Sequence, residues 1–214
     1  MVNIYIFSMK RTTILLIGLI GLAITSCSSE QQSVSDTDNK KLKYTIDLEN
    51  SSIKWKGQMS PEYGHAGTLN FSEGVLNISG ETVVDGQFTV DMTTLKNTDL
   101  NPQKEEVLVG HLTGNLVDEN HPADMFFNVV KFPNISVSIN GYKNNTLDLT
   151  LLILGKELKQ SVAATVTTDP NRASITGDFT LDLTSINIPG LQPNPDGSQI
   201  SPVIEFEVAI SLEK

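Results

Sequence analysis

Apolar and polar residues alternate along most of the chain after position 42. In 175–183 and 204–212 every second residue is apolar or glycine, and the residues between them are mostly Asp, Glu, Thr or Ser. Successive side chains of a β-strand point to opposite faces, so each segment would have one apolar and one polar face. This pattern is typical of half-buried antiparallel strands, and about nine or ten fit between residues 44 and 212. The sequence therefore predicts an all-β, antiparallel domain.

Turn signals separate these strands, and helical periodicity is nearly absent. A short helix is expected only over 105–116, with a further turn over 122–125. The expected turns and loops are rich in Gly, Asn, Asp, Ser and Pro and lie at 72–74, 79–80, 85–86, 140–141, 144–145, 169–171 and 189–197.

The apolar strand faces need a partner surface. The sheet must pack on a second sheet or close into a barrel, and the pattern leaves both open. A barrel of about eight strands has an interior that side chains can fill or that can hold one small ligand. A filled barrel would be a scaffold, whereas a hollow one would be a carrier.

The N-terminal segment has the features of a bacterial lipoprotein signal. Lys10 and Arg11 precede an uncharged apolar run over 12–24, which is shorter than the ~20 residues of a bilayer-spanning helix. The run leads into the sequence Ile-Thr-Ser-Cys ending at Cys27, which resembles a lipobox. The alternative is an uncleaved anchor with an incidental buried cysteine.

The lipobox interpretation predicts how the chain is divided and where it resides. We expect a signal peptide over 1–26, acyl chains such as palmitate on Cys27, a polar flexible tether over 27–41 and the domain over 42–214. Ser28 follows the cysteine where an inner-membrane protein would usually carry Asp. The predicted location is therefore the outer membrane, with the domain facing the periplasm.

Charge and composition exclude several classes of function. The chain has 25 acidic and 15 basic residues and lacks the clustered Lys and Arg that phosphate backbones require, which argues against nucleic acid. Its single cysteine excludes an internal disulfide framework and a Cys-based zinc site. No nucleotide-binding or G-x-S-x-G motif occurs, so we expect no cofactor, no catalytic residue and no enzyme activity.

The three histidines are the remaining polar candidates. His65, His111 and His121 do not have the close spacing of metal-ligand motifs such as HxxxH. His111 and His121 could still approach one another, or join Asp118 or Glu119. We expect His65 and His111 to form hydrogen bonds at strand ends or in loops, and predict no metal site.

A series of motifs, in order along 42–214, resembles the YceI-like family of bacterial polyisoprenoid-binding domains. The resemblance is strongest at His111-Leu112 and over 123–133; no single motif is diagnostic, but their order along the chain is fairly specific. The motifs include Tyr44-x-Ile46-Asp47, Ser52-Ile53-x-Trp55-x-Gly57, Gly64-His65-Ala66-Gly67, Gly86-x-Phe88-x-Val90-Asp91-Met92, His111-Leu112, Phe126-Phe127-Asn128 and Leu149-x-Leu151-x-Ile153-x-Gly155-Lys156.

This resemblance implies a lipocalin-like barrel whose interior takes a long isoprenoid chain. Asn128 replaces the family's usual Asp, and Leu183 stands where many members have Arg, which puts recognition of a charged head group in doubt. The family allows oligomers. The expected ligand-lining residues are Trp55, Phe88, Val90, Met92, Phe127, Leu149, Leu151, Phe179, Leu181, Phe206 and Val208, with His65 and His111 as polar candidates. The alternative is an envelope structural module in which these side chains simply pack on each other.

Overall fold

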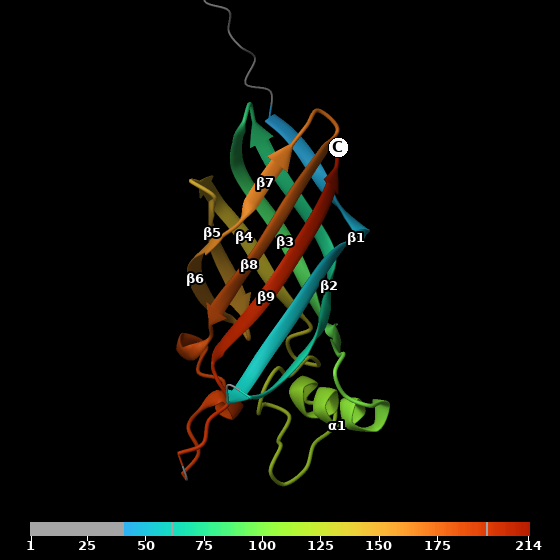
Figure 1. Cartoon of the computed structure of the whole chain (residues 1–214), viewed down its shortest axis with the longest axis vertical. Helices are drawn as coiled ribbons and strands as arrows, with labels where there is room; N and C mark the ends of the chain where they lie inside the picture. The colour runs from blue at the N-terminus through green and yellow to red at the C-terminus, as the bar shows by residue number, and fades with distance from the viewer. Residues whose placement is uncertain (1–40, 61, 196) are drawn as a thin grey trace, which may run out of the picture. The chain divides into compact units, whose positions relative to one another are not determined.

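The computed structural model describes residues 41–60, 62–195 and 197–214 (Figure 1). They belong to the second of two compact units, Asp38–Lys214. The predicted signal peptide, Cys27 and nearly all of the predicted tether lie outside the described residues. Within the described part of the chain, no helix combines the length and apolar character needed to cross a bilayer.

Nine antiparallel strands form one sheet, as the alternation predicts. The order across the sheet is β6-β5-β4-β3-β2-β1-β9-β8-β7. Every pair of neighbouring strands is consecutive in the sequence except β1 and β9, and the consecutive strands β6 and β7 do not pair. The strands are β1 (Lys41–Ser60), β2 (Tyr63–Ser79), β3 (Thr82–Asn97), β4 (Asn134–Lys143), β5 (Thr146–Ile153), β6 (Lys156–Ala163), β7 (Thr165–Thr168), β8 (Arg172–Asp182) and β9 (Val203–Glu213).

The sheet curls into a lipocalin-like half-barrel with β6 and β7 at its edges (Figure 1). The side chain of Gln160 joins β6 to β8, the strand next to the β7 edge. Gln160 Nε2 donates to the carbonyl of Thr180 at 2.6 Å, and Gln160 Oε1 accepts from the backbone N–H of Asp182 at 3.3 Å. The interior is therefore enclosed without a continuous hydrogen-bond ladder around the barrel.

Cross-strand pairs on β1 and β9 show how the alternation sorts side chains between the two faces. Trp55 pairs with Phe206 on the inner face, while the next pair, Lys54 and Glu207, forms an outer salt bridge of 2.7 Å. The acidic residues expected on the outer face are all exposed: Asp178, Asp182, Glu205 and Glu207.

Three of the turn predictions are wrong, because the residues concerned lie inside strands. Residues 72–74 belong to β2, 85–86 to β3 and 140–141 to β4, and the strand register shifts next to 72–74 and 140–141. Glycine and small polar residues suit β-bulges as well as turns, so the local signal does not separate the two. The turns at 79–80, 144–145 and 169–171 are where they were expected.

The helix α1 covers Pro102–Thr113, three residues earlier at each end than expected. Asn101 caps its N-terminus by accepting from the Lys104 N–H, Pro102 follows the cap, and Gly114 ends the helix in the left-handed conformation. The expected turn at 122–125 is present, with Met125 N–H bonded to the Pro122 carbonyl at 2.8 Å. Two 3-10 turns, η1 (Thr184–Ile186) and η2 (Pro189–Leu191), precede β9.

Candidate functional site

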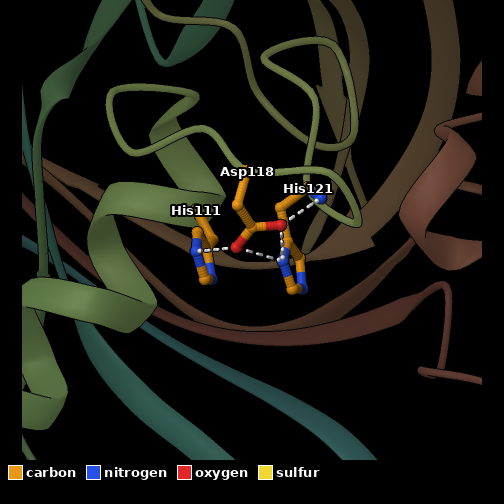
Figure 2. A group of neighbouring side chains, drawn as sticks. All are labelled: His111, Asp118 and His121. Carbon is orange, nitrogen blue, oxygen red and sulfur yellow. Dashed lines mark hydrogen bonds and ion pairs between the residues drawn. The ribbon is translucent and has the colours of Figure 1, made fainter.

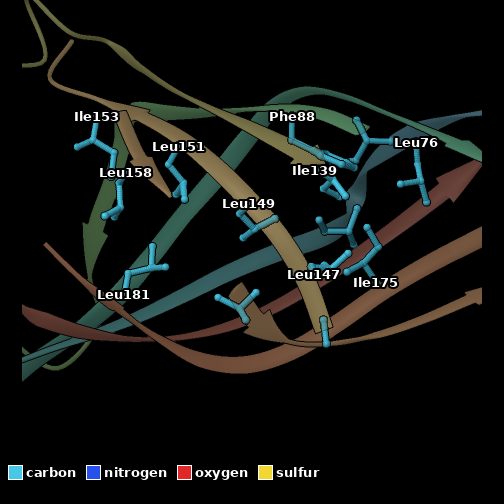
Figure 3. Packing of buried hydrophobic residues seen from close by; sticks show 14 of the residues in the cluster. Leu76, Phe88, Ile139, Leu147, Leu149, Leu151, Ile153, Leu158, Ile175 and Leu181 are labelled. Atoms are coloured by element: carbon cyan, nitrogen blue, oxygen red, sulfur yellow. The ribbon is translucent and has the colours of Figure 1, made fainter. Parts of the chain in front are cut away.

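The curled sheet encloses a cavity of about 390 Å³, within the range typical of small-molecule sites. Figure 3 shows part of its wall, where side chains from several strands point into the same space. Leu149 and Leu151 come from β5, Phe88 from β3 and Leu181 from β8. The wall is overwhelmingly apolar because each strand presents its inner face to this space.

The structure brings all eleven expected lining residues together around the cavity. They come from β1, β3, β5, β8, β9 and the segment after α1: Trp55, Phe88, Val90, Met92, Phe127, Leu149, Leu151, Phe179, Leu181, Phe206 and Val208. Of the polar candidates, His65 also lines the cavity, whereas His111 is absent from its wall. That these residues bind a ligand stays a prediction.

Sequence reasoning missed part of the wall. Ile135, Val137 and Ile139 of β4 line the cavity, and their alternation with serines is a signal that could have found them. Leu108 and Leu112 of α1 also line it. Their spacing of four residues places them on one helix face.

Adjacent residues of a β-strand point to opposite faces, so Phe126 and Phe127 would not both reach the interior if they lay in a strand. They lie instead in the irregular segment between α1 and β4, and both line the cavity. The Phe127 N–H bonds to the Leu112 carbonyl at 2.9 Å, which fastens this segment to the end of α1. The strand argument fails because backbone outside a sheet has no two-residue period.

The cavity reaches the surface beside the ends of β1 and β2. Met59 and Tyr63 line the cavity and are also 49% and 57% exposed. Gln58 and His65 line it nearby and add polar side chains. We call Gln58, Met59, Tyr63, Gly64 and His65 the mouth.

Hydrogen bonds hold His65 in place at the mouth. Its Nδ1 lies 3.3 Å from Asp99 Oδ1, and its Nε2 lies 3.4 Å from the Tyr63 hydroxyl. Burial is the largest influence on Asp99 and acts to raise its pKa. Hydrogen bonds from Asn97, Ala66 and His65 outweigh burial, so the pKa of Asp99 lies below its ordinary value. The expectation that His65 forms hydrogen bonds at a strand end matches this geometry.

Trp55 lines the cavity and has a buried, unpaired indole N–H. Among the described residues with buried side-chain polar atoms, the indole Nε1 of Trp55 lacks a hydrogen-bond partner. Its ring lies against Gly67, where an added Cβ would be 2.6 Å from the ring. Leaving a buried N–H unpaired is costly, so Trp55 departs from the usual pairing of buried donors.

The opposite end of the barrel is filled. Tyr44, Leu76, Ile78 and Leu212 pack there, each at most 1% exposed. The Tyr44 hydroxyl donates to the Asp169 carbonyl at 2.8 Å, which satisfies its polar atom. The interior is thus hollow towards the mouth and solid at the other end.

Leu183 lies in the cavity wall, where the resemblance implied an Arg in many family members. It is 4% exposed, and its N–H bonds to the Pro202 carbonyl. At this position the wall therefore has an apolar side chain in place of a cation.

A second group of polar side chains lies outside the cavity wall. His111 lies in the last turn of α1, and a loop brings Asp118 and His121 beside it (Figure 2). Hydrogen bonds from the backbone N–H of Asn120, from the His121 side chain and from the His121 N–H hold the pKa of Asp118 below its ordinary value. The approach of His111 to His121 was one of the arrangements the sequence left open.

Comparisons with known proteins agree with this architecture. The family profile described as the YceI-like domain matches residues 44–213. No curated protein matches the chain.

The solved structures that resemble the fold include the following two. BcnA of Burkholderia cenocepacia is 15% identical with a TM-score of 0.58, covering 78% of this chain and 98% of that one. A polyisoprenoid binding domain from Saccharophagus degradans, implicated in plant cell wall breakdown, is 14% identical with a TM-score of 0.54, covering 79% and 97%. With the profile matching nearly all of the described domain, the chain belongs to the YceI-like domain family.

Proposed function

We propose that this protein binds a long apolar lipid of the polyisoprenoid class inside the half-barrel and performs no chemistry on it. The observation that carries the proposal is the apolar cavity, hollow towards a polar mouth and closed at the other end. The similarity to a solved polyisoprenoid binding domain supports the choice of lipid class.

The apolar wall is sufficient for useful affinity. Micromolar binding corresponds to about −8 kcal/mol, and association costs at least about 4 kcal/mol in lost freedom. Each methylene-sized unit moved out of water contributes about 0.8 kcal/mol. About 15 such units, or roughly three isoprene units, therefore reach micromolar affinity before any polar contact is counted.

The polar groups favour a ligand with an uncharged oxygen at one end. Gln58 and His65 place polar side chains at the mouth. Leu183 provides no positive charge for an anionic head group. A polyprenol with a terminal hydroxyl fits these features.

The single tryptophan makes the binding test direct. Trp55 is the only Trp in the chain and lines the cavity, so its fluorescence should shift to shorter wavelength when polyprenols of about three or more isoprene units are added. Native mass spectrometry should show one bound lipid per chain. An unchanged Trp55 spectrum together with no bound lipid would overturn the proposal.

The second candidate is a structural module of the envelope with no ligand. It requires an interior filled by side chains, whereas this interior retains a cavity of about 390 Å³. Purification from the native host, with no co-purifying lipid and no binding of added polyprenols, would favour the module.

We further propose that the protein is a lipoprotein anchored through Cys27 in the outer membrane, with its domain in the periplasm. The support is the lipobox-like sequence before Cys27 and the polar segment after it. Metabolic labelling with a clickable palmitate should mark the native chain and not a Cys27→Ser variant. Equal labelling of both chains, or labelling of neither, contradicts the anchor.

A further inference from the structure

The residues His111, Asp118 and His121 meet on the surface beside the last turn of α1 (Figure 2). Each offers one ligand atom, and these atoms all lie within 4.8 Å of one another. His111 Nε2 is 3.3 Å from Asp118 Oδ2, and His121 Nδ1 is 3.0 Å from both carboxylate oxygens. Both imidazoles therefore turn a nitrogen towards the same carboxylate.

From this geometry we propose that His111, Asp118 and His121 bind a transition-metal dication of the zinc class. Two nitrogens and a carboxylate oxygen form a donor set that suits Zn²⁺, Co²⁺, Ni²⁺ or Cu²⁺, whereas Mg²⁺ and Ca²⁺ prefer oxygen alone. Three protein ligands leave a fourth position for water. The Asp118 side chain is 47% exposed and that of His121 is 37% exposed, so an ion can reach the site from solvent.

The distances show how far the ligand atoms are from zinc-binding positions. Two ligands of one tetrahedral zinc ion, bonded at 2.0–2.1 Å, lie about 3.3 Å apart. The separations between the carboxylate and the imidazoles already have about this length. The two histidine nitrogens must approach each other by at most about 1.5 Å, judged against this same ligand separation.

The imidazole rings must turn when the ion binds. They are stacked, with centroids 4.0 Å apart and planes 7° from parallel. A metal lies in the plane of each imidazole that binds it, so two parallel rings cannot share one ion without rotation. His121 is on an exposed turn and can rotate more freely than His111, whose side chain is 17% exposed.

The backbone explains why these ligands meet. Gly114 ends α1, and an added Cβ there would lie 2.5 Å from the Ala123 carbonyl oxygen, so the chain folds back closely over the helix end. Asp118 and His121 then form a tight turn, in which each backbone N–H bonds to the other's carbonyl at 3.2 and 3.3 Å. A bound ion would link this turn to α1 through its ligands.

The test is metal titration of the untagged full-length chain by calorimetry, using Zn²⁺ and, for spectroscopy, Co²⁺. We expect one equivalent to bind with a Kd of micromolar or tighter, a Co²⁺ absorption spectrum of tetrahedral type, and a higher thermal midpoint. His121→Ala should weaken binding on the order of 100-fold, since loss of even an outer-shell partner costs 10–100-fold. Asp118→Asn should also weaken it.

The third histidine provides the matched control. His65 contacts Asp99 and Tyr63 at the mouth and is not part of the His111, Asp118 and His121 group, so His65→Ala should leave the zinc affinity unchanged. The proposal is overturned if no saturable 1:1 binding occurs below about 1 mM, or if His121→Ala binds as tightly as the unaltered chain. Loss of affinity in His65→Ala with retention in His121→Ala would place the ion elsewhere and overturn it equally.

Discussion

Gly57 is a position where the cavity can be blocked without disturbing the fold. It lies in β1 on the inner face and lines the cavity. Among the described residues, an added Cβ would meet only Ile204 Cδ1 within 4 Å, at 3.6 Å, which is an ordinary contact. We therefore expect Gly57→Leu to place its side chain in the cavity, with a thermal midpoint equal to or above that of the unaltered chain.

The expected loss of affinity follows from the displaced volume. A Leu side chain has four carbons and excludes about four methylene-sized units of ligand. At about 0.8 kcal/mol each this is about 3 kcal/mol, or a Kd weaker on the order of 100-fold. Gly57→Ala excludes about one unit and should weaken binding about fourfold.

The assay is titration with a polyprenol, followed by Trp55 fluorescence and checked by native mass spectrometry. Lys56→Leu is the matched control, because it adds the same side chain one residue away on the outer face, where Lys56 makes a 3.6 Å ion pair with Glu205. If Gly57→Leu binds within about threefold of the unaltered chain, or if both variants lose affinity equally, the ligand does not occupy this cavity.

Three further predictions concern stability. Gly190→Ala should lower the free energy of unfolding by about 1–3 kcal/mol in urea denaturation, because the added Cβ would lie 2.3 Å from the Phe126 ring. The control is Gly141→Ala, whose added Cβ would have its only contact at 4.0 Å and should leave the free energy of unfolding close to unchanged. Asn101→Ala removes the cap of α1 and should cost about 1 kcal/mol in the same assay; a cost near zero would show that the cap is dispensable. The folded-state pKa of Asp99 is lowered, so its contribution to stability is present above its unfolded pKa and is lost as pH falls through the folded value. Thermal midpoints measured from pH 5 down to pH 2 should therefore fall less in Asp99→Asn than in the unaltered chain. An equal fall in both chains would contradict this prediction.

Strand identity and the inner face were readable from the sequence because both are local properties. Leu147, Leu149, Leu151 and Ile153 alternate with polar or exposed residues, and all four are buried. Two-residue periodicity is set by the backbone of a single strand, whatever its neighbours are. The family resemblance then placed these faces around a common interior.

Features that depend on how neighbouring strands pair were harder to predict from the sequence. Residues 72–74 and 140–141 have the composition of turns, but the register between neighbouring strands makes them bulges. The ends of α1 lie three residues earlier than the predicted 105–116, at the capping residues Asn101, Pro102 and Gly114.

The sequence by itself determined an antiparallel sheet with one apolar face and named most of the residues on that face. Only the tertiary structure decided that this interior is hollow near Trp55 and Gly57 and solid around Tyr44. Likewise it alone brought His111, Asp118 and His121 within reach of one ion. The physical reason is that periodicity is a property of neighbours along the chain, whereas an empty volume or a ligand set depends on side chains that folding brings together from distant positions.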